Sequence, residues 1–169
     1  MIYIYPRMAF GTGDHPTTRM CLKLLEKHMP PGARVIDIGS GSGILAIAAV
    51  RLGARSVTAV EMDEAAIENA RENLRFNRVL SKVKLVHAPF SGRIRGPFDL
   101  GVCNMLTHVI EPILDDITKL LEGKRLIVSG ASATSTAEIK RELGRRGWRI
   151  WKTLREDEWV GLFAVHEST

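Results

Sequence analysis

The sequence predicts an α/β fold in which a mostly parallel sheet ends in an antiparallel strand. Short β-type runs alternate with longer helical patterns from Arg34 onward, as expected for parallel strands joined by crossover helices. Glycines between the first β-type run and the next helical pattern suit a ligand-binding loop at the carboxyl edge of such a sheet. After Gly147, two β-type runs are separated by only a few polar residues, which predicts a terminal hairpin.

The individual elements follow from the spacing of the apolar residues. The parallel strands are expected at residues 34–38, 56–61, 82–87, 98–104 and 124–129, and the hairpin strands at 148–154 and 158–166. Helices are expected at residues 16–28, 44–52, 64–76, 112–121 and 135–146. Pro112 suits the first turn of its helix, because proline lacks the N–H that is unpaired there anyway. Ser135 and Glu138 have the spacing of a capping box, and Gly147 should end that last helix.

Length and composition predict one folded, soluble domain over residues 1–169, with a loop and helix in residues 1–32 and the α/β core in 33–169. No apolar run approaches the roughly 20 residues that a bilayer span needs, and the N-terminus has no signal-peptide pattern. The two cysteines, Cys21 and Cys103, have no zinc-site spacing, so we expect a reducing cytoplasm and no metal.

The charge balance gives weak support for an anionic partner. The formal charge is +5 and the sequence pI is about 9.5, which could favour RNA. Most of these charges are expected on solvated helix faces, and no interleaving of aromatic and basic residues is evident. RNA therefore remains an alternative partner.

The most specific local signal is the glycine motif after residues 34–38. Gly39, Gly41 and Gly43 allow the backbone to approach a ligand closely and leave N–H groups at a helix start. The spacing G-x-G-x-G differs from the G-x-G-x-x-G that accommodates a pyrophosphate, so a nucleoside-type ligand is favoured over NAD. Asp37 could accept a hydrogen bond from a ligand amine, or it could hold the loop through backbone N–H groups.

Two polar residues stand at the ends of other predicted strands, where open α/β sheets bind ligands. Glu61 ends the second strand and is expected to bind both hydroxyls of a ribose; an exposed carboxylate near a helix start is the alternative. Asn104 ends the fourth strand and could orient an amine, because its amide both donates and accepts; a turn role is the alternative.

Several motifs in order along the chain resemble the ribosomal protein L11 methyltransferase family. They are the loop Phe-Gly-Thr-Gly-Asp-His-Pro-Thr-Thr at 10–18, the glycine motif followed by Ile-Leu-Ala-Ile-Ala-Ala, Ala-Val-Glu-Met-Asp at 59–63, Asn-Met-Leu at 104–106 and Glu-Trp-Val at 158–160. The glycine motif alone is typical of many S-adenosylmethionine enzymes, whereas the 10–18 loop is far more family-specific.

This resemblance implies a Rossmann-like class I methyltransferase fold, with a seven-stranded sheet and an antiparallel last strand. It also implies methylation of protein amino groups from S-adenosylmethionine, with S-adenosylhomocysteine as product. The implied cofactor contacts are Phe10, Thr12, Gly13, His15, Thr17, Asp37, Gly39, Gly41, Gly43, Glu61, Met62 and Asn104. Asn104 is also the implied catalytic residue, and the 10–18 loop is expected to act as a lid.

The acceptor is less well determined by the sequence. Family members usually carry an N-terminal substrate-recognition domain, and this chain begins a few residues before the loop, so it is interpreted as either a catalytic part or a stand-alone relative. A protein substrate is favoured, with a ribosomal protein as one candidate; an RNA or small-molecule acceptor and a non-catalytic nucleotide-binding module are the alternatives. His108 is a weaker candidate for proton transfer, and His87, His108 and Glu111 do not form a persuasive metal set.

Overall fold

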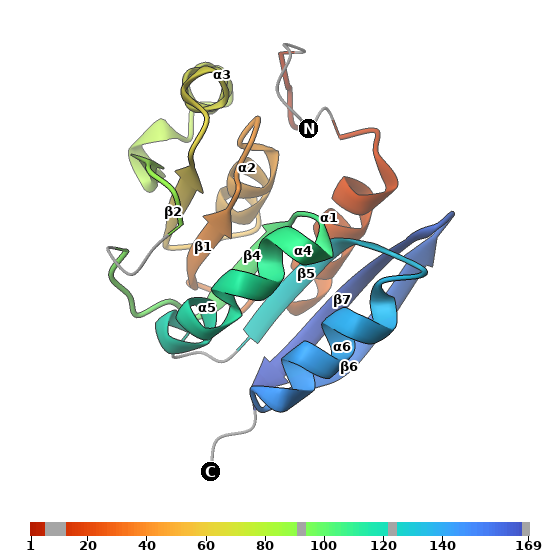
Figure 1. Cartoon of the computed structure of the whole chain (residues 1–169). Helices are drawn as coiled ribbons and strands as arrows, with labels where there is room; N and C mark the ends of the chain where they lie inside the picture. Colours follow the sequence, from red (N-terminus) through yellow and green to blue (C-terminus); the bar gives the residue numbers. More distant parts are fainter. Residues whose placement is uncertain (6–12, 91–93, 122–124, 167–169) are drawn as a thin grey trace.

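The computed structural model describes residues 1–5, 13–90, 94–121 and 125–166 of the chain, and a seven-stranded sheet forms its centre (Figure 1). The strand order is β3-β2-β1-β4-β5-β7-β6. The strands are β1 (Arg34–Ile38), β2 (Ser56–Glu61), β3 (Val83–His87), β4 (Leu100–Asn104), β5 (Arg125–Ser132), β6 (Trp148–Glu156) and β7 (Trp159–His166).

Strand direction follows the predicted topology. Neighbouring strands among β1 to β5 pair in parallel, whereas β7 pairs antiparallel with both β5 and β6. The expectation of a mostly parallel sheet with an antiparallel last strand is therefore confirmed. Because β1 lies beside both β2 and β4, the chain reverses its direction of travel across the sheet there, and such a switch point leaves a crevice at the strands' carboxyl ends.

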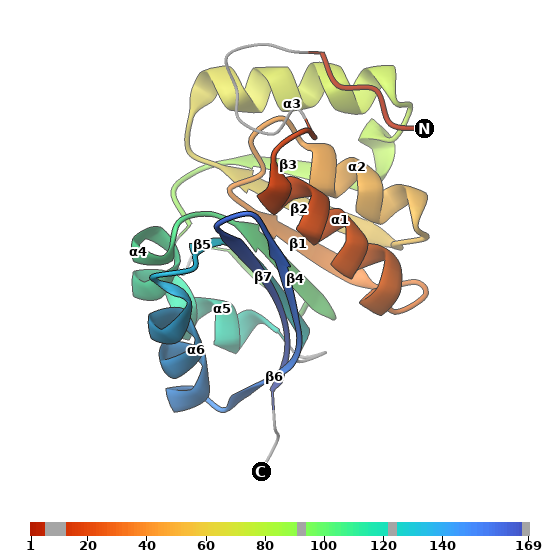
Figure 2. The same ribbon diagram turned by 90° about the vertical axis from the view of Figure 1, so that its right-hand side faces the viewer.

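Helices cover both faces of the sheet (Figure 2). One layer holds α1 (Pro16–His28), α2 (Ile44–Arg51) and α3 (Glu64–Phe76); the other holds α4 (Thr107–Ile110), α5 (Leu114–Leu120) and α6 (Thr136–Arg145). Two short 3-10 turns, η1 (Leu80–Lys82) and η2 (Glu111–Ile113), complete the described elements. Each layer has its own apolar cluster, with Leu24, Ile47 and Leu74 in the first and Ile117, Ile139 and Leu143 in the second.

Two local predictions are wrong. The helix expected at 112–121 starts at Leu114, because Pro112 lies in the η2 turn between α4 and α5. Ser135 does not form a capping box: its backbone is helical, with φ −91° and ψ −4°, and its side chain makes no cap hydrogen bond. The Ser135 hydroxyl instead accepts a local bond from Ser132 N at 3.0 Å and a tertiary bond from the Thr107 hydroxyl at 3.1 Å, and these replace the expected cap.

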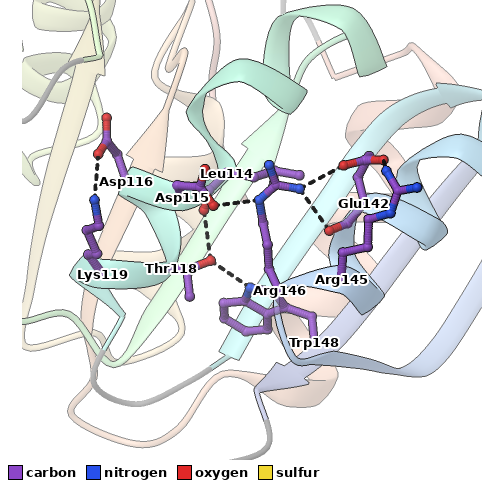
Figure 3. Close-up of polar contacts among 9 residues, drawn as sticks. All are labelled: Leu114, Asp115, Asp116, Thr118, Lys119, Glu142, Arg145, Arg146 and Trp148. Carbon is purple, nitrogen blue, oxygen red and sulfur yellow. Dashed lines mark hydrogen bonds and ion pairs between the residues drawn. The ribbon is translucent and has the colours of Figure 1, made fainter.

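A polar cluster joins α5 to α6 and β6 (Figure 3). The Arg146 guanidinium donates to Asp115 Oδ1 at 2.7 Å and to Glu142 Oε2 at 2.9 Å. Trp148 Nε1 donates to the Thr118 hydroxyl at 2.9 Å. Arg146 lowers the pKa of Glu142, so this nearly buried carboxylate stays charged and paired. The cluster therefore fixes the second helix layer on the sheet, away from the crevice.

No helix within the described ranges is long and apolar enough to cross a membrane.

Candidate functional site

A cavity of about 680 Å³ opens at the carboxyl ends of β1, β2 and β4. This volume lies within the range of roughly 300–1,000 Å³ that small-molecule sites usually have. Its wall includes the predicted residues His15, Thr17, Gly39, Gly41, Glu61, Met62 and Asn104, which come from four separate parts of the chain. The sheet therefore brings together most of the predicted cofactor contacts that the structure describes.

The glycine loop makes the floor of the cavity and has little room for side chains. Gly39, Gly41 and Gly43 have φ angles of +70°, +51° and +81°, in the left-handed region that glycine adopts without strain. A Cβ added at Gly39 would lie 2.6 Å from Met105 Sδ. Gly39 N and Ser40 N both donate to Val60 O, at 2.9 and 3.0 Å, which ties the loop to the end of β2.

Glu61 lies on the cavity wall at the end of β2. Its Oε2 accepts from Gly41 N at 3.0 Å, and its Oε1 accepts from Met62 N at 2.8 Å and Asp63 N at 3.0 Å. Because a carboxylate has about four acceptor positions, these bonds hold it in place and still leave capacity for a ligand hydroxyl. Met62 beside it is 71% exposed and offers an apolar surface at the cavity edge.

Asp37 lies behind the glycine loop and has no exposed surface. Its Oδ2 accepts from Ala46 N in α2 at 3.1 Å, while its Oδ1 has no hydrogen-bond partner within the described chain. Burial raises the pKa of Asp37 to about 7; the Ala46 N–H opposes this rise, and the charge of Glu61 adds to it. This hydrogen bond joins the end of β1 to the first turn of α2, the two elements that flank the glycine loop.

Asn104 reaches the opposite wall from the end of β4. Its Nδ2 donates to the hydroxyl of Thr18, in the first turn of α1, at 3.2 Å. Thr18 is buried, so this hydrogen bond fixes the Asn104 side-chain amide against the first turn of α1. Because the amide nitrogen points to Thr18, the Asn104 carbonyl oxygen remains available as an acceptor.

His15 and Trp159 form a third side of the cavity. Their rings meet edge to face with centroids 5.2 Å apart. His15 Nδ1 also lies 2.7 Å from the Thr17 hydroxyl, and the His15 side chain caps α1 by accepting from Thr17 N. The Arg19 guanidinium contacts Glu156 and the Asp14 carbonyl, and so joins the start of α1 to the β6–β7 turn.

Some predicted site residues lie elsewhere. Phe10 and Thr12, with most of the predicted lid loop, fall outside the described residues. Gly13 has φ +100° and lies against Ile44, and Gly43 is the N-cap of α2 with Ala70 close behind it. Among the described candidates, Gly13, Gly43 and Asp37 are not part of the cavity wall, whereas the seven residues named above are.

Sequence reasoning missed several wall residues. Thr18 and Ser40 add polar groups, and Phe90, Leu106 and Trp159 add apolar surface. Ser40 is 5% exposed and its hydroxyl has no partner within the described chain, which marks a buried polar atom at the cavity without a protein contact. Thr18, Ser40, Leu106 and Trp159 lay inside recognised motifs, whereas Phe90 follows β3 and carries no local signal.

The described residues contain no group of three or more histidine, cysteine or acidic side chains placed to hold a metal ion. His87 Nε2 lies 3.1 Å from the Met62 carbonyl oxygen, and His108 lies in the short helix α4.

Residues 1–167 match the family described as Ribosomal protein L11 methyltransferase (PrmA). The chain belongs to this family. The ribosomal protein L11 methyltransferases of Bacillus cytotoxicus and Bacillus cereus (strain B4264) are each 41% identical to it over 165 residues, which make up 97% of this chain and 53% of each relative. The chain thus spans about half the length of these curated relatives.

Solved structures agree with this family assignment. A ribosomal protein L11 methylase from Lactobacillus delbrueckii subsp. bulgaricus has a TM-score of 0.91 and 31% identity, covering 98% of this chain and 84% of that one. Magnesium protoporphyrin IX methyltransferase from Synechocystis, solved with bound S-adenosylmethionine, has a TM-score of 0.72 and 21% identity, covering 89% and 78%. The second likeness shows the fold alone. The predicted Rossmann-like methyltransferase fold and family resemblance are both confirmed.

Proposed function

We propose that this chain transfers a methyl group from S-adenosylmethionine to a lysine or amino group of a protein, with residues 1–169 acting as one methyltransferase domain. The proposal is supported above all by one observation. A single cavity of about 680 Å³ is lined by Gly39, Gly41, Glu61 and Asn104. Membership of the ribosomal protein L11 methyltransferase family supports it, and the family's printed name favours a ribosomal protein as acceptor. The free, buried cysteines Cys21 and Cys103 suit a reducing cytoplasm.

The residues present fit S-adenosylmethionine. Glu61 is positioned to accept from ribose hydroxyls, and Met62 offers an apolar surface for a base. The positive φ of Gly39 and its approach to Met105 leave backbone, not side chain, facing the ligand space. The unpartnered Ser40 hydroxyl is available to a polar group of the ligand. Asp37 acts indirectly, by holding α2 and the loop in register.

When bound, the cofactor supplies a methyl group on a sulfonium, which is already activated for displacement. The protein therefore needs mainly to orient the acceptor and exclude water. An acceptor amine must arrive without its proton, because a protonated amine has no lone pair. The apolar surface of Leu106, Val109 and Trp159 favours the neutral amine by desolvation, and the Asn104 carbonyl can accept one of its N–H groups.

Labelled S-adenosylmethionine and a cell extract test the reaction and its acceptor class together. The purified chain is incubated with extract that has been treated with protease or with ribonuclease, and the labelled product is counted. Loss of label after protease alone is expected. Loss after ribonuclease alone would show an RNA acceptor, label that resists both enzymes would show a small molecule, and no label in any extract would contradict the activity. The Asn104→Ala variant is the control for enzyme-dependent labelling.

A further inference from the structure

The edge strand β6 carries an exposed tryptophan that the cavity does not use. Trp151 is 62% exposed, whereas Trp148, three residues earlier in the same strand, is only 3% exposed. The register of β6 against β7 shifts between Ile150 and Lys152, so Trp151 sits at a β-bulge. Bulges redirect a side chain out of the regular alternation. Trp148 belongs to the core, whereas Trp151 is exposed to solvent beside the bulge.

Basic side chains surround this tryptophan. The guanidinium carbon of Arg149 lies 5.4 Å from the centroid of the Trp151 ring, and Lys152 follows it in the strand. Helix α1 packs beside β6 and contributes Lys27 near its C-terminal end. We call Lys27, Arg149, Trp151 and Lys152 the Trp151 surface; all four residues are exposed.

Two observations indicate that the Trp151 surface is electropositive. His28 is stacked on Phe163 with ring centroids 4.1 Å apart, and its pKa is lowered by burial and then by the charges of Lys27 and Lys152. The two lysines therefore raise the positive potential at one place although they belong to different elements. The carboxylate of Glu156 lies at the far end of β6 and is bound by Arg19 and Lys23.

Protection of the sheet edge explains only part of this arrangement. Charged residues and a bulge on an edge strand prevent pairing with another chain. An exposed tryptophan works against that protection, because it adds apolar surface at the edge. Tryptophan beside cations is instead the pattern of surfaces that stack a nucleic-acid base and neutralise its phosphates. The expectation that no aromatic residue interleaves with the basic ones is wrong at β6, where the Arg149 guanidinium lies over the Trp151 ring and Lys152 follows in the sequence.

We propose that the Trp151 surface binds single-stranded RNA, with a base stacked on Trp151 and phosphates near Lys27, Arg149 and Lys152. Its charge complements an anionic strand, and its one exposed aromatic ring favours a nucleotide over an acidic peptide. The surface uses none of the cavity residues, so it adds a binding function to the proposed methyl transfer and does not depend on it.

Fluorescence anisotropy with a labelled 12-nucleotide oligouridylate tests the proposal on the full chain. Trp151→Ala should weaken binding about 5-fold or more, the lower end for loss of one stacked base. Phe76→Ala is the matched control, because Phe76 is also 62% exposed but lies at the end of α3, and it should leave the affinity unchanged. A double Lys27→Glu, Lys152→Glu variant should bind more weakly and lose part of the salt dependence. A double Lys82→Glu, Lys84→Glu variant, at exposed positions beside the opposite edge of the sheet, changes the net charge by the same amount and is the control.

A competition with poly-L-glutamate distinguishes RNA from an acidic protein segment. Unlabelled oligouridylate should displace the probe, and poly-L-glutamate at equal charge should not. Absence of oligouridylate binding, equal affinity of wild type and Trp151→Ala, or equal displacement by both polyanions would each overturn the proposal. Unchanged melting temperatures of the variants show that altered binding does not come from unfolding.

Discussion

The Oε2 atom of Glu61 accepts a hydrogen bond from Gly41 N at 3.0 Å, across the gap between the end of β2 and the glycine loop after β1. One side chain therefore both fixes the loop and faces the cavity. This double role means that its removal should affect ligand binding through a direct contact and through the shape of the loop.

Glu61→Ala should weaken S-adenosylhomocysteine binding by about 1.5–3 kcal/mol, the range for a charge-assisted hydrogen bond. Calorimetry measures this directly. Glu64→Ala, which removes an exposed carboxylate in the first turn of α3, should bind like the wild type. Unchanged affinity of Glu61→Ala would remove Glu61 from the site.

Asn104→Ala should lower turnover by about 100-fold while leaving cofactor affinity nearly intact, because misplacing an acceptor costs rate without removing the ribose contact. Turnover at saturating cofactor and the dissociation constant of S-adenosylhomocysteine separate the two effects. Asn104→Asp keeps an acceptor oxygen and tests whether the carbonyl is the group required. A variant that lost cofactor binding but kept full turnover at saturation would contradict the assigned role.

Gly130→Ala should destabilise the fold far more than Gly53→Ala. Both glycines have φ +96°, so both substitutions carry a similar backbone cost of about 1–2 kcal/mol. A Cβ at Gly130 would lie 2.4 Å from the Met105 carbonyl oxygen, whereas a Cβ at Gly53 meets nothing within 4 Å. The clash should therefore lower the free energy of unfolding of Gly130→Ala by about a further 1–3 kcal/mol, as measured by urea unfolding. An equal loss of unfolding free energy in the two variants would contradict this prediction and would show that the backbone near Met105 shifts to relieve the clash.

Asp37 should make stability fall as pH rises. Its pKa is about 7 in the folded protein, above the ordinary value of 3.8, because burial disfavours its charged form. Between these values the folded protein keeps a proton that the unfolded chain releases, so the free energy of unfolding decreases with pH through this window and is lowest above it. Asp37→Asn has no proton to lose and should show a flatter profile in urea unfolding at pH 5, 6, 7 and 8. Parallel profiles for the two proteins would contradict a raised pKa.

The sequence alone determined the order of the elements, the terminal hairpin and the position of the glycine loop. These features are local: apolar spacing, glycine placement and short polar connections act over a few residues. Glu61 and Asn104 could also be found from sequence, because each ends a β-type run and parallel strands end at one edge of the sheet.

Only the tertiary structure decided which side chains face the cavity and which support it. Asp37 and Gly39 belong to one motif, yet Asp37 is buried behind the loop and Gly39 lies on the cavity wall. The Ser135 hydroxyl makes no cap hydrogen bond and accepts from the hydroxyl of Thr107 in α4. Trp148 and Trp151 lie in the same strand, yet Trp148 is buried and Trp151 is exposed, as the cover over each face of the edge strand decides. In each case the outcome depends on partners far along the chain or in the neighbouring strand, and burial and hydrogen bonding there outweigh local preference.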